Sequence, residues 1–454
     1  MSHTIAAIST PAAAGGIGVI RISGDKAIET AEKVVCTTSG KSLLTMKGYT
    51  AAHGKVMLRG EAIDECVALI FRAPKSYTGE DVVEISCHGG ILVTNRVLEA
   101  VLSAGARPAE AGEFTKRAFL NGKMDLSEAE GVMALIGARG VQGMRAAMNT
   151  LDGALSRKIN ELKAELVSAA AHMSAWVDYP DDEIPEIDFG NLEIMLTKVK
   201  SELEALLSKF DAGKAITEGV DTAIVGKPNV GKSALMNMLS GFNRSIVTDI
   251  AGTTRDVVEQ TVRVGSVILR LADTAGIRDC DDIVESIGVD LAKTKIERAE
   301  LILAVFDGSS ELDEKDKEIF SLCDGKDVIA IVNKSDLPCK ADSDYIKQKY
   351  PEAVYISAAT GEGENQLTGA IEKVLGTDKI DTSQAMLTTQ RQKANATAAL
   401  ESINEALDAI QMGMTMDAVN VCIDTAIEQL LELTGQKAKE VVVNEVFSQF
   451  CVGK

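Results

Sequence analysis

The sequence predicts a multidomain protein of mixed α/β and α class, with an α/β domain inserted in a discontinuous helical domain and preceded by an α+β domain. A glycine-rich segment, residues 226–233, follows a short apolar run, as in the first loop of many α/β domains. Helical periodicity stands on both sides of that region. The chain has 454 residues, more than the roughly 250–300 at which a single core stops growing.

Composition argues against a disordered, secreted or membrane-spanning chain. Hydrophobic residues make up 46% of the sequence, aromatic residues 4% and charged residues 25%, as expected of packed, helix-rich domains. No apolar run reaches the ~18 residues that span a bilayer, and residues 1–22 lack the pattern of a signal peptide. The eight cysteines include no C-x-x-C pair, so neither a disulfide framework nor a zinc site is indicated. We therefore expect a cytoplasmic protein without a membrane partner.

The net charge of −20 disfavours broad, unaided binding of nucleic acid, whose phosphates require local positive charge. The charge is uneven, because residues 1–123 hold 14 Lys and Arg against 12 Asp and Glu, which leaves −22 for the rest of the chain. Any polyanion site is therefore expected near the first domain or on a partner.

Sequence texture divides the chain into four segments. Residues 1–120 alternate short apolar stretches with Gly, Ser and Pro, which is typical of an α+β domain. Residues 121–215 and 379–454 have helical periodicity, and residues 216–378 form the inserted α/β domain. One long amphipathic helix is predicted from a core stripe at three- and four-residue steps: Leu151, Leu155, Ile159, Leu162, Leu166, Ala169 and Met173. Packing the two helical segments together would bury their stripes and suits transmission of a movement from the inserted domain.

Strand, glycine-rich loop and helix follow one another at the start of the inserted domain. Residues 222–225 are β-like, and residues 234–239 begin an apolar helix. In such a phosphate loop (P-loop), backbone N–H groups close around phosphates, Lys232 reaches the outer phosphate oxygens, and Ser233 can ligate Mg²⁺. The predicted phosphate-binding residues are Asn229, Val230, Gly231, Lys232, Ser233 and Ala234.

Two further segments suit contact with an outer phosphate. Asp273-Thr274-Ala275-Gly276 follows the apolar run 267–272, at a strand end where α/β sheets bind ligands. Gly276 could sense a γ-phosphate through its backbone N–H. Thr253 and Thr254 lie between this motif and the P-loop, so the Thr254 hydroxyl could close onto Mg²⁺ while the γ-phosphate is present. An ordinary loop is the alternative for the two threonines.

The choice of base is predicted from two segments that follow apolar runs. Asp336 supplies two acceptor oxygens, which match two adjacent donors on guanine. We expect this carboxylate to be buried, so that leaving it unpaired would penalise ATP. Residues 357–359 can offer a backbone N–H to the guanine carbonyl. The predicted contacts are Asn333, Lys334, Asp336, Ser357, Ala358 and Ala359. Four ordered motifs thus predict binding and hydrolysis of GTP, with Lys232 as a catalytic residue.

One residue that orients the attacking water in many GTPases is missing. Small GTPases of the Ras type carry Gln directly after the Asp-x-x-Gly motif, where this chain has Ile277. An apolar side chain cannot polarise water, so another group must act, or the protein is only a slow switch. Residues 278–285 offer several carboxylates, although composition alone favours a solvated acidic loop there.

Longer motifs give the whole chain a resemblance to a known family. They are residues 5–11, 15–24, 77–84, 88–90 and 112–123, together with the two most diagnostic ones, 248–256 and the terminal Cys451-Val-Gly-Lys454. The chain resembles the MnmE family, also called TrmE, of bacterial tRNA-modification GTPases. The resemblance implies a P-loop GTPase domain within a discontinuous helical domain, after an α+β domain similar to folate-binding domains.

The resemblance also implies how hydrolysis proceeds without that glutamine. In the family, K⁺ beside the phosphates does the work of an arginine finger, and a glutamate downstream of the Asp-Thr-Ala-Gly motif positions the water. Glu285 matches that glutamate, and Asn229 matches the K⁺ ligand. Thr248, Ile250 and Thr253 would line the same ion, within a nucleotide-binding segment of Thr248, Asp249, Ile250, Ala251, Gly252, Thr253 and Thr254. The ion site would be completed when two GTPase domains of a homodimer meet face to face.

In the first domain, the resemblance implies a site for a tetrahydrofolate derivative, 5-formyl- or methylene-tetrahydrofolate. Arg21, Glu84 and Lys123 match the family's folate-binding positions, and Lys454 would reach the same pocket. Considered without the family, each is expected in a surface or salt-bridge role. Phe71 and Phe114 could pack near the pterin.

Cys451 would ordinarily be an inconsequential thiol near a frayed end, but the Cys-x-Gly-Lys ending implies a functional, catalytic role. One departure from the family is Ala12-Ala-Ala14, where relatives often carry Pro, Gly and a charged residue. This departure concerns the local loop shape and not Arg21.

The implied function is shared with an FAD-dependent partner, MnmG, in a heterotetramer or larger assembly. Together they would add a carboxymethylaminomethyl-type group to carbon five of the wobble uridine of certain tRNAs, with a carbon from folate and FAD only on the partner. A ribosome-assembly GTPase remains an alternative, since such proteins share the Pro-Asn-x-Gly-Lys-Ser loop, but it would need neither the first domain nor Cys451. A K⁺-sensing regulatory or scaffold dimer is a third possibility.

Overall fold

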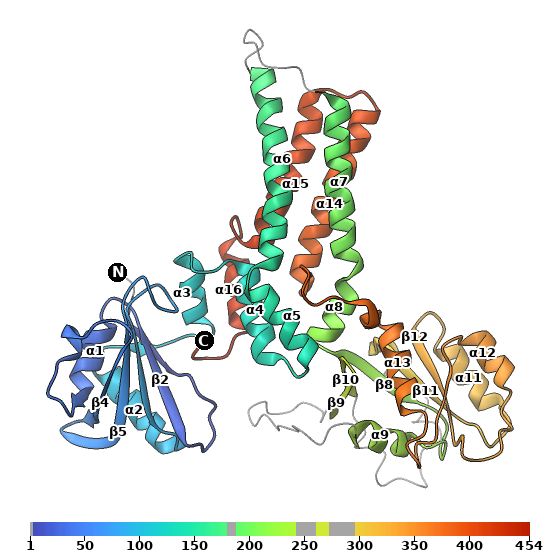
Figure 1. The fold of residues 1–454 in the computed structure, drawn as a ribbon, viewed down its shortest axis with the longest axis horizontal. Coiled ribbons are helices and arrows are strands. Elements are labelled where there is room, and N and C mark those ends of the chain that lie inside the picture. Colours follow the sequence, from blue (N-terminus) through green and yellow to red (C-terminus); the bar gives the residue numbers. More distant parts are fainter. Residues whose placement is uncertain (1–2, 179–187, 242–259, 272–295) are drawn as a thin grey trace. The chain divides into compact units, whose positions relative to one another are not determined.

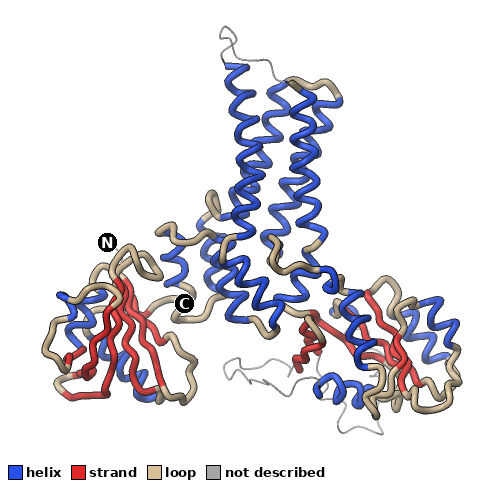
Figure 2. The backbone as a smooth tube through the Cα atoms, in the orientation of Figure 1, coloured by secondary structure: helices blue, strands red, loops and turns tan. Residues whose placement is uncertain are grey.

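The computed structural model describes residues 3–178, 188–241, 260–271 and 296–454, drawn in Figure 1 and Figure 2. The chain forms two compact units, one of residues 1–133 with 427–454 and the other of residues 134–426. Within the described ranges, no helix combines the length and the apolar character needed to cross a membrane.

The first unit contains a seven-stranded sheet with the order β3-β4-β5-β6-β2-β1-β7. Its neighbouring strands are antiparallel except for β1 and β7, which are parallel. The strands are β1 Ile5–Ile8, β2 Ile17–Ser23, β3 Val35–Thr37, β4 Thr50–Leu58, β5 Glu61–Phe71, β6 Val82–His88 and β7 Arg107–Pro108. Helices α1 (Ala27–Val34) and α2 (Ile91–Ser103) share one core with one face of this sheet.

Successive side chains of a strand point to opposite faces of the sheet, so every second residue of β2 points away from that core. Ile20 and Ile22 of β2 are fully buried under the helices, so the residue between them, Arg21, lies on the opposite face. The register places Arg21 directly across from Glu84 of β6. A basic and an acidic side chain are thereby paired on the face of the sheet that α1 and α2 do not cover.

The rest of the first unit consists of short helices and the two chain-terminal segments. It contains the 3₁₀ turn η1 (Leu43–Thr45), α3 (Glu113–Leu120), α16 (Glu440–Ser448) and parts of α4 (Leu126–Gly137) and α15 (Met416–Thr434). The start of α3 is fixed by buried charges: Arg117 bonds Glu113 (2.9 Å) and Glu80 (2.8 Å). The motif at residues 112–123 therefore has a structural role.

The helical part of the second unit buries five of the seven residues of the predicted core stripe, leaves Leu151 and Ala169 half-buried, and divides the predicted helix. It contains α5 (Val141–Leu151), α6 (Ala154–Asp178), α7 (Phe189–Ser208), α8 (Phe210–Thr217) and α14 (Gln390–Gln411). The single helix predicted through Leu151 to Met173 is wrong at its start, because Gly153 has φ +78 and separates α5 from α6. Helices α6 and α14 both pack against α7, so helical segments from before and after the inserted domain share a core.

The described residues of the inserted domain contain a six-stranded sheet with the order β13-β12-β11-β8-β10-β9. Only β9 is antiparallel to its neighbour. The strands are β8 Val220–Val225, β9 Gln260–Val264, β10 Val267–Leu271, β11 Leu301–Asp307, β12 Asp327–Asn333 and β13 Val354–Tyr355. The described helices are α9 Lys232–Gly241, α11 Glu314–Leu322, α12 Ser343–Lys349, α13 Glu364–Val374 and the 3₁₀ turn η2 Thr377–Lys379.

Two hydrophobic cores, one against each face, bury this sheet. The central strand β11 is accordingly apolar from Leu301 to Phe306, and all six of these residues are buried. The predicted fold class is confirmed: an α/β domain interrupts a helical domain and an α+β domain precedes both. Since β8, β11 and β12 are parallel, the residues that follow Val225, Asp307 and Asn333 meet at one edge of the sheet.

Candidate functional site

The P-loop connects the end of β8 to the start of α9, and its backbone requires glycine. Gly226 and Gly231 have φ +154 and +98, and Asn229 also lies in the left-handed region at φ +65. A Cβ on Gly226 would lie 2.5 Å from the carbonyl oxygen of Val305 on β11. The loop is therefore packed directly against the neighbouring strand end.

The buried side chain of Asn333 joins three loops at this edge of the sheet. Its Nδ2 donates to the carbonyl of Val230 in the P-loop at 2.8 Å, and its Oδ1 accepts from the Ala358 N–H at 2.9 Å. A Cβ on Gly231 would lie 2.1 Å from that Nδ2. Asn333, predicted as a nucleotide contact, thus already bonds the P-loop to the segment after β13.

Lys232 and Ser233 begin α9, whose first N–H groups have no partners within the helix and so favour an anion. The Lys232 ammonium donates to the carbonyls of Gly226 (2.8 Å) and Lys227 (2.7 Å). Burial lowers the pKa of Lys232. Ser233 and Asn229 are exposed, and their hydroxyl and amide oxygens are hard ligands that suit Mg²⁺ and K⁺ respectively.

The segment after β12 differs in one respect from the prediction. Asp336 is exposed, so the expectation that protein atoms bury its carboxylate is wrong. Lys334 has φ +67 and its Nζ lies 2.6 Å from Asp307 Oδ2. Burial acts to raise the pKa of Asp307, but hydrogen bonds from Lys334 and Ser309 outweigh it, so the pKa lies below its usual value.

Asp307 is a residue that the sequence analysis missed. It ends the buried strand β11 beside Asn333, and an acid at that position of an apolar run was the available signal. Of the three predicted N–H groups at residues 357–359, Ser357 donates to the Glu362 carbonyl at 3.0 Å and Ala358 donates to Asn333. The Ala359 N–H donates to no described residue, which leaves it as the best candidate to meet guanine.

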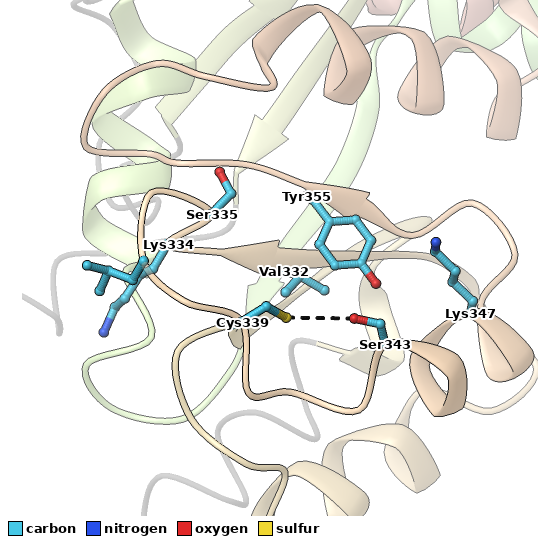
Figure 3. A pocket seen from close by; sticks show the side chains of 9 residues that line it. Val332, Lys334, Ser335, Cys339, Ser343, Lys347 and Tyr355 are labelled. Atoms are coloured by element: carbon cyan, nitrogen blue, oxygen red, sulfur yellow. Dashed lines mark hydrogen bonds between the residues drawn. The ribbon is translucent and has the colours of Figure 1, made fainter.

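A pocket of about 390 Å³ lies beside the segment that follows β12 (Figure 3). It is lined by Gly308, Val332, Lys334, Ser335, Leu337, Cys339, Ser343, Lys347 and Tyr355. The Cys339 thiol lies 3.7 Å from the Ser343 hydroxyl, as the dashed line marks. Asp336 does not line it, so this pocket is not assigned as the guanine site.

The remaining predicted residues of this domain lie outside the described residues. They are Thr248, Asp249, Ile250, Ala251, Gly252, Thr253, Thr254, Asp273, Thr274, Ala275, Gly276, Ile277 and Glu285. The γ-phosphate contacts, most of the K⁺ ligands and the water-positioning glutamate therefore stay predictions.

In the first unit, Arg21 and Glu84 form an ion pair at 2.8 Å, with side chains 14% and 24% exposed. The Arg21 guanidinium also lies over the rings of Tyr77 (5.2 Å) and Phe114 (5.7 Å). The Tyr77 hydroxyl is hydrogen-bonded to that of Thr115 at 2.8 Å. The pair is thus a partly exposed polar group bordered by aromatic side chains.

The C-terminal tail is docked against this pair. Val452 forms an antiparallel bridge with Ala111, and the backbone oxygen of Lys454 accepts from the Phe114 N–H at 3.2 Å. The Gly453 carbonyl accepts from Ser9 Oγ (3.0 Å) and from Arg21 Nη1 (3.4 Å). Burial and then Arg21 lower the pKa of Lys454, while Glu84 acts in the opposite direction. Lys454 therefore shares the environment of Arg21 and Glu84.

In the described part of the chain, the side chains of three other predicted residues make no hydrogen bond or ion pair with Arg21 or Glu84. Lys123 is exposed, and its Nζ donates to the Pro74 carbonyl at 3.2 Å. Phe71 packs edge-on against Tyr49, with ring centroids 5.5 Å apart. Cys451 is exposed, and its carbonyl accepts from the Gly112 and Lys454 N–H groups. Of the four predicted folate contacts, Arg21 and Glu84 are paired directly, and Lys454 lies close enough for both charges to act on its pKa. The Lys123 ammonium instead bonds the Pro74 carbonyl.

Gly231→Ala tests the role of Asn333 in the nucleotide site. The added Cβ would clash with Asn333 Nδ2 and separate it from Val230, so we expect GDP affinity to fall at least about tenfold. Gly369→Ala is the matched control, because Gly369 lies inside α13 and no described side chain lies within 4 Å of its added Cβ. Isothermal titration calorimetry gives both affinities. A GDP affinity equal to that of the unaltered chain in Gly231→Ala would contradict the assignment.

Comparisons with known proteins cover nearly the whole chain. The family model of the GTP-binding protein TrmE N-terminus matches residues 4–123, and that of the MnmE helical domain matches residues 126–451. Curated relatives called tRNA modification GTPase MnmE match nearly end to end. That of Bacillus pumilus (strain SAFR-032) is 43% identical over 99% of this chain and 100% of its own, and that of Clostridioides difficile (strain 630) is 42% identical over 100% of both.

Among solved structures, an Era variant from Aquifex aeolicus bound to GDP and AlF₄⁻ is 30% identical. It covers 40% of this chain and 66% of its own, with a TM-score of 0.27, so the fold assignment rests on the strand order and not on this similarity. The relatives match over the full length at identities above 40%. The chain therefore belongs to the MnmE family of tRNA modification GTPases.

Proposed function

We propose that this chain is a K⁺-stimulated GTPase that modifies tRNA as a cytoplasmic homodimer, together with an FAD-dependent partner of the MnmG type. The product is a carboxymethylaminomethyl-type group on carbon five of the wobble uridine, with one carbon supplied from folate. The docked C-terminal tail carries this proposal, because it brings Lys454 to Arg21 and Glu84 in a domain that has no nucleotide motif. A GTPase that acts only as a switch has no use for such a cluster.

GTP is bound at the edge of the six-stranded sheet. The N–H groups at the start of α9 and the Lys232 ammonium, which the loop carbonyls already hold, receive the phosphates. Asp336 accepts from the two adjacent guanine donors and the Ala359 N–H donates to the guanine carbonyl. Because Asp336 is exposed, the bound base itself supplies the burial that makes this pair selective.

Hydrolysis needs positive charge near the phosphate oxygens and an oriented water molecule. Ser233 and Thr254 would hold Mg²⁺, and Asn229, Thr248, Ile250 and Thr253 would hold K⁺. These ions supply the positive charge that stabilises the developing negative charge. Glu285 orients the water in place of the glutamine that Ile277 replaces. Ser233 and Asn229 fit this role, because each offers an exposed oxygen ligand beside the P-loop lysine.

The folate derivative binds at Arg21, Glu84 and Lys454. The Glu84 carboxylate is partly exposed and can accept paired N–H donors such as those of a pterin, and the Tyr77 and Phe114 rings border the same place. Lys123 is exposed near Pro74, where a flexible cation can meet the anionic end of the folate. The folate supplies the methylene carbon, and the lowered pKa of Lys454 makes its neutral amine easier to reach than that of an ordinary lysine.

Asp336→Asn tests the choice of guanine. The substitution replaces one acceptor oxygen with a donor that faces the donors of guanine, so we expect GTP affinity to fall about 100-fold. Affinity for XTP, which has a carbonyl in place of the guanine amino group, should rise. Asp344→Asn removes an exposed carboxylate from α12 and serves as the control. Competition against a fluorescent GDP analogue measures the GTP and XTP affinities of both variants. An unchanged preference for GTP over XTP in Asp336→Asn would overturn the assignment.

Cys451→Ser tests whether the docked tail takes part in tRNA modification. The Cys451 thiol is exposed. Gly453, whose carbonyl accepts from Arg21, follows Cys451 by two residues in the sequence. We expect GTP hydrolysis to stay unchanged and the modified wobble nucleoside to disappear, as measured by mass spectrometry of tRNA from cells that carry only the variant. Cys36→Ser, at another exposed cysteine of the same unit, is the control. A normal nucleoside profile in Cys451→Ser would favour a GTPase without modification chemistry.

A further inference from the structure

The P-loop carries a second lysine, Lys227, which neither the motif nor the proposed nucleotide contacts use. Its Nζ lies 2.7 Å from Asp316 Oδ2 and 2.9 Å from Asp313 Oδ2. Asp313 is the N-cap of α11, and Asp316 is the third residue of that helix, in a reciprocal capping box. One side chain of the P-loop is therefore anchored to the N-cap of a helix 86 residues further along the chain.

Asp316 is an uncommon acid because its side chain is only 2% exposed. Its Oδ2 accepts from Lys227 and from the Asp313 N–H (3.0 Å), while its Oδ1 has no hydrogen-bond partner among the described residues. A carboxylate in that position requires a nearby cation. Burial acts to lower the pKa of Lys227, but Asp316 and Asp313 outweigh it and raise that pKa, which keeps the lysine charged.

The same residue also holds the phosphate-binding lysine. The backbone carbonyl of Lys227 accepts from Lys232 Nζ at 2.7 Å, next to the bond from Lys232 to Gly226. The side chain of Lys227 thus fixes the position of a carbonyl that in turn fixes the Lys232 ammonium. Without the ion pairs of the Lys227 side chain, the Lys227 peptide is free to move. The Lys232 ammonium then no longer has a fixed position.

We propose that Lys227 and Asp316 are a positioning pair for phosphate binding, which ties the P-loop to α11 and so presents Lys232 to the β- and γ-phosphates. The inference rests on the proposed GTP binding and goes beyond it, because neither residue is among the proposed nucleotide contacts. A purely structural ion pair would support α11 and the sheet, and its loss would weaken binding of every guanine nucleotide to the same extent.

GDP and GMP separate these two roles, because GMP keeps the guanine and ribose but lacks the β-phosphate that the P-loop and Lys232 receive. Both nucleotides are titrated with Mg²⁺ against a fluorescent GDP analogue bound to the full-length chain. In Lys227→Met we expect GDP affinity to fall at least about tenfold and GMP affinity to change less than about twofold. Lys227→Arg, which keeps the charge, should restore most of the GDP affinity.

Lys317→Met is the matched control, since Lys317 makes an exposed ion pair with Glu314 on the same helix. Should Lys227→Met fail to fold, Asp316→Asn is measured instead, with the same selective loss expected. An unchanged ratio of GDP to GMP affinity in a folded variant, or an equal loss in Lys317→Met, would overturn the positioning role. An unaltered chain that binds neither nucleotide would instead refute the proposed GTPase function.

Discussion

The two hydrogen bonds of the Asn333 side chain are the interaction on which the nucleotide site depends. They join the P-loop carbonyl of Val230 to the N–H of Ala358, and so connect the ends of β8, β12 and β13. Asn333 is 3% exposed, so losing either bond leaves a buried polar group unsatisfied, at a cost of about 1–3 kcal/mol. Position 231 must therefore be glycine, because any side chain there would occupy the place of the Asn333 amide. Phosphate and base recognition therefore share one rigid support.

A similar constraint shapes the first unit, where a sheet register and a glycine hold the charged cluster. The β2–β6 register sets Arg21 against Glu84, and a slip of β6 by one residue would turn Glu84 towards the core and away from Arg21. Gly453 has φ +98, and a Cβ there would lie 2.4 Å from the Ile8 carbonyl. The terminal Cys-x-Gly-Lys sequence is thus a docking element, in which the glycine permits the close approach that brings Lys454 to the cluster.

The sequence predicts best what depends on neighbours along the chain. The P-loop and the guanine segment were located because each follows an apolar run that proves to be a buried strand. The break at Gly153 was missed, since the helical stripe continues in phase across it. The exposure of Asp336 could not be deduced, because burial depends on elements that pack from elsewhere. The Lys227–Asp316 and Arg21–Gly453 contacts join distant residues, and no local pattern signals them.

Asn333 supports the site, whereas Asp336 and the Ala359 N–H are the proposed contacts of guanine. A crystal structure of the chain with GDP and Mg²⁺ tests this division most directly. It should retain the bonds from Asn333 to Val230 and Ala358, with Asp336 and the Ala359 N–H on the base. An Asn333 side chain turned onto the guanine, with both of those bonds broken, would contradict it.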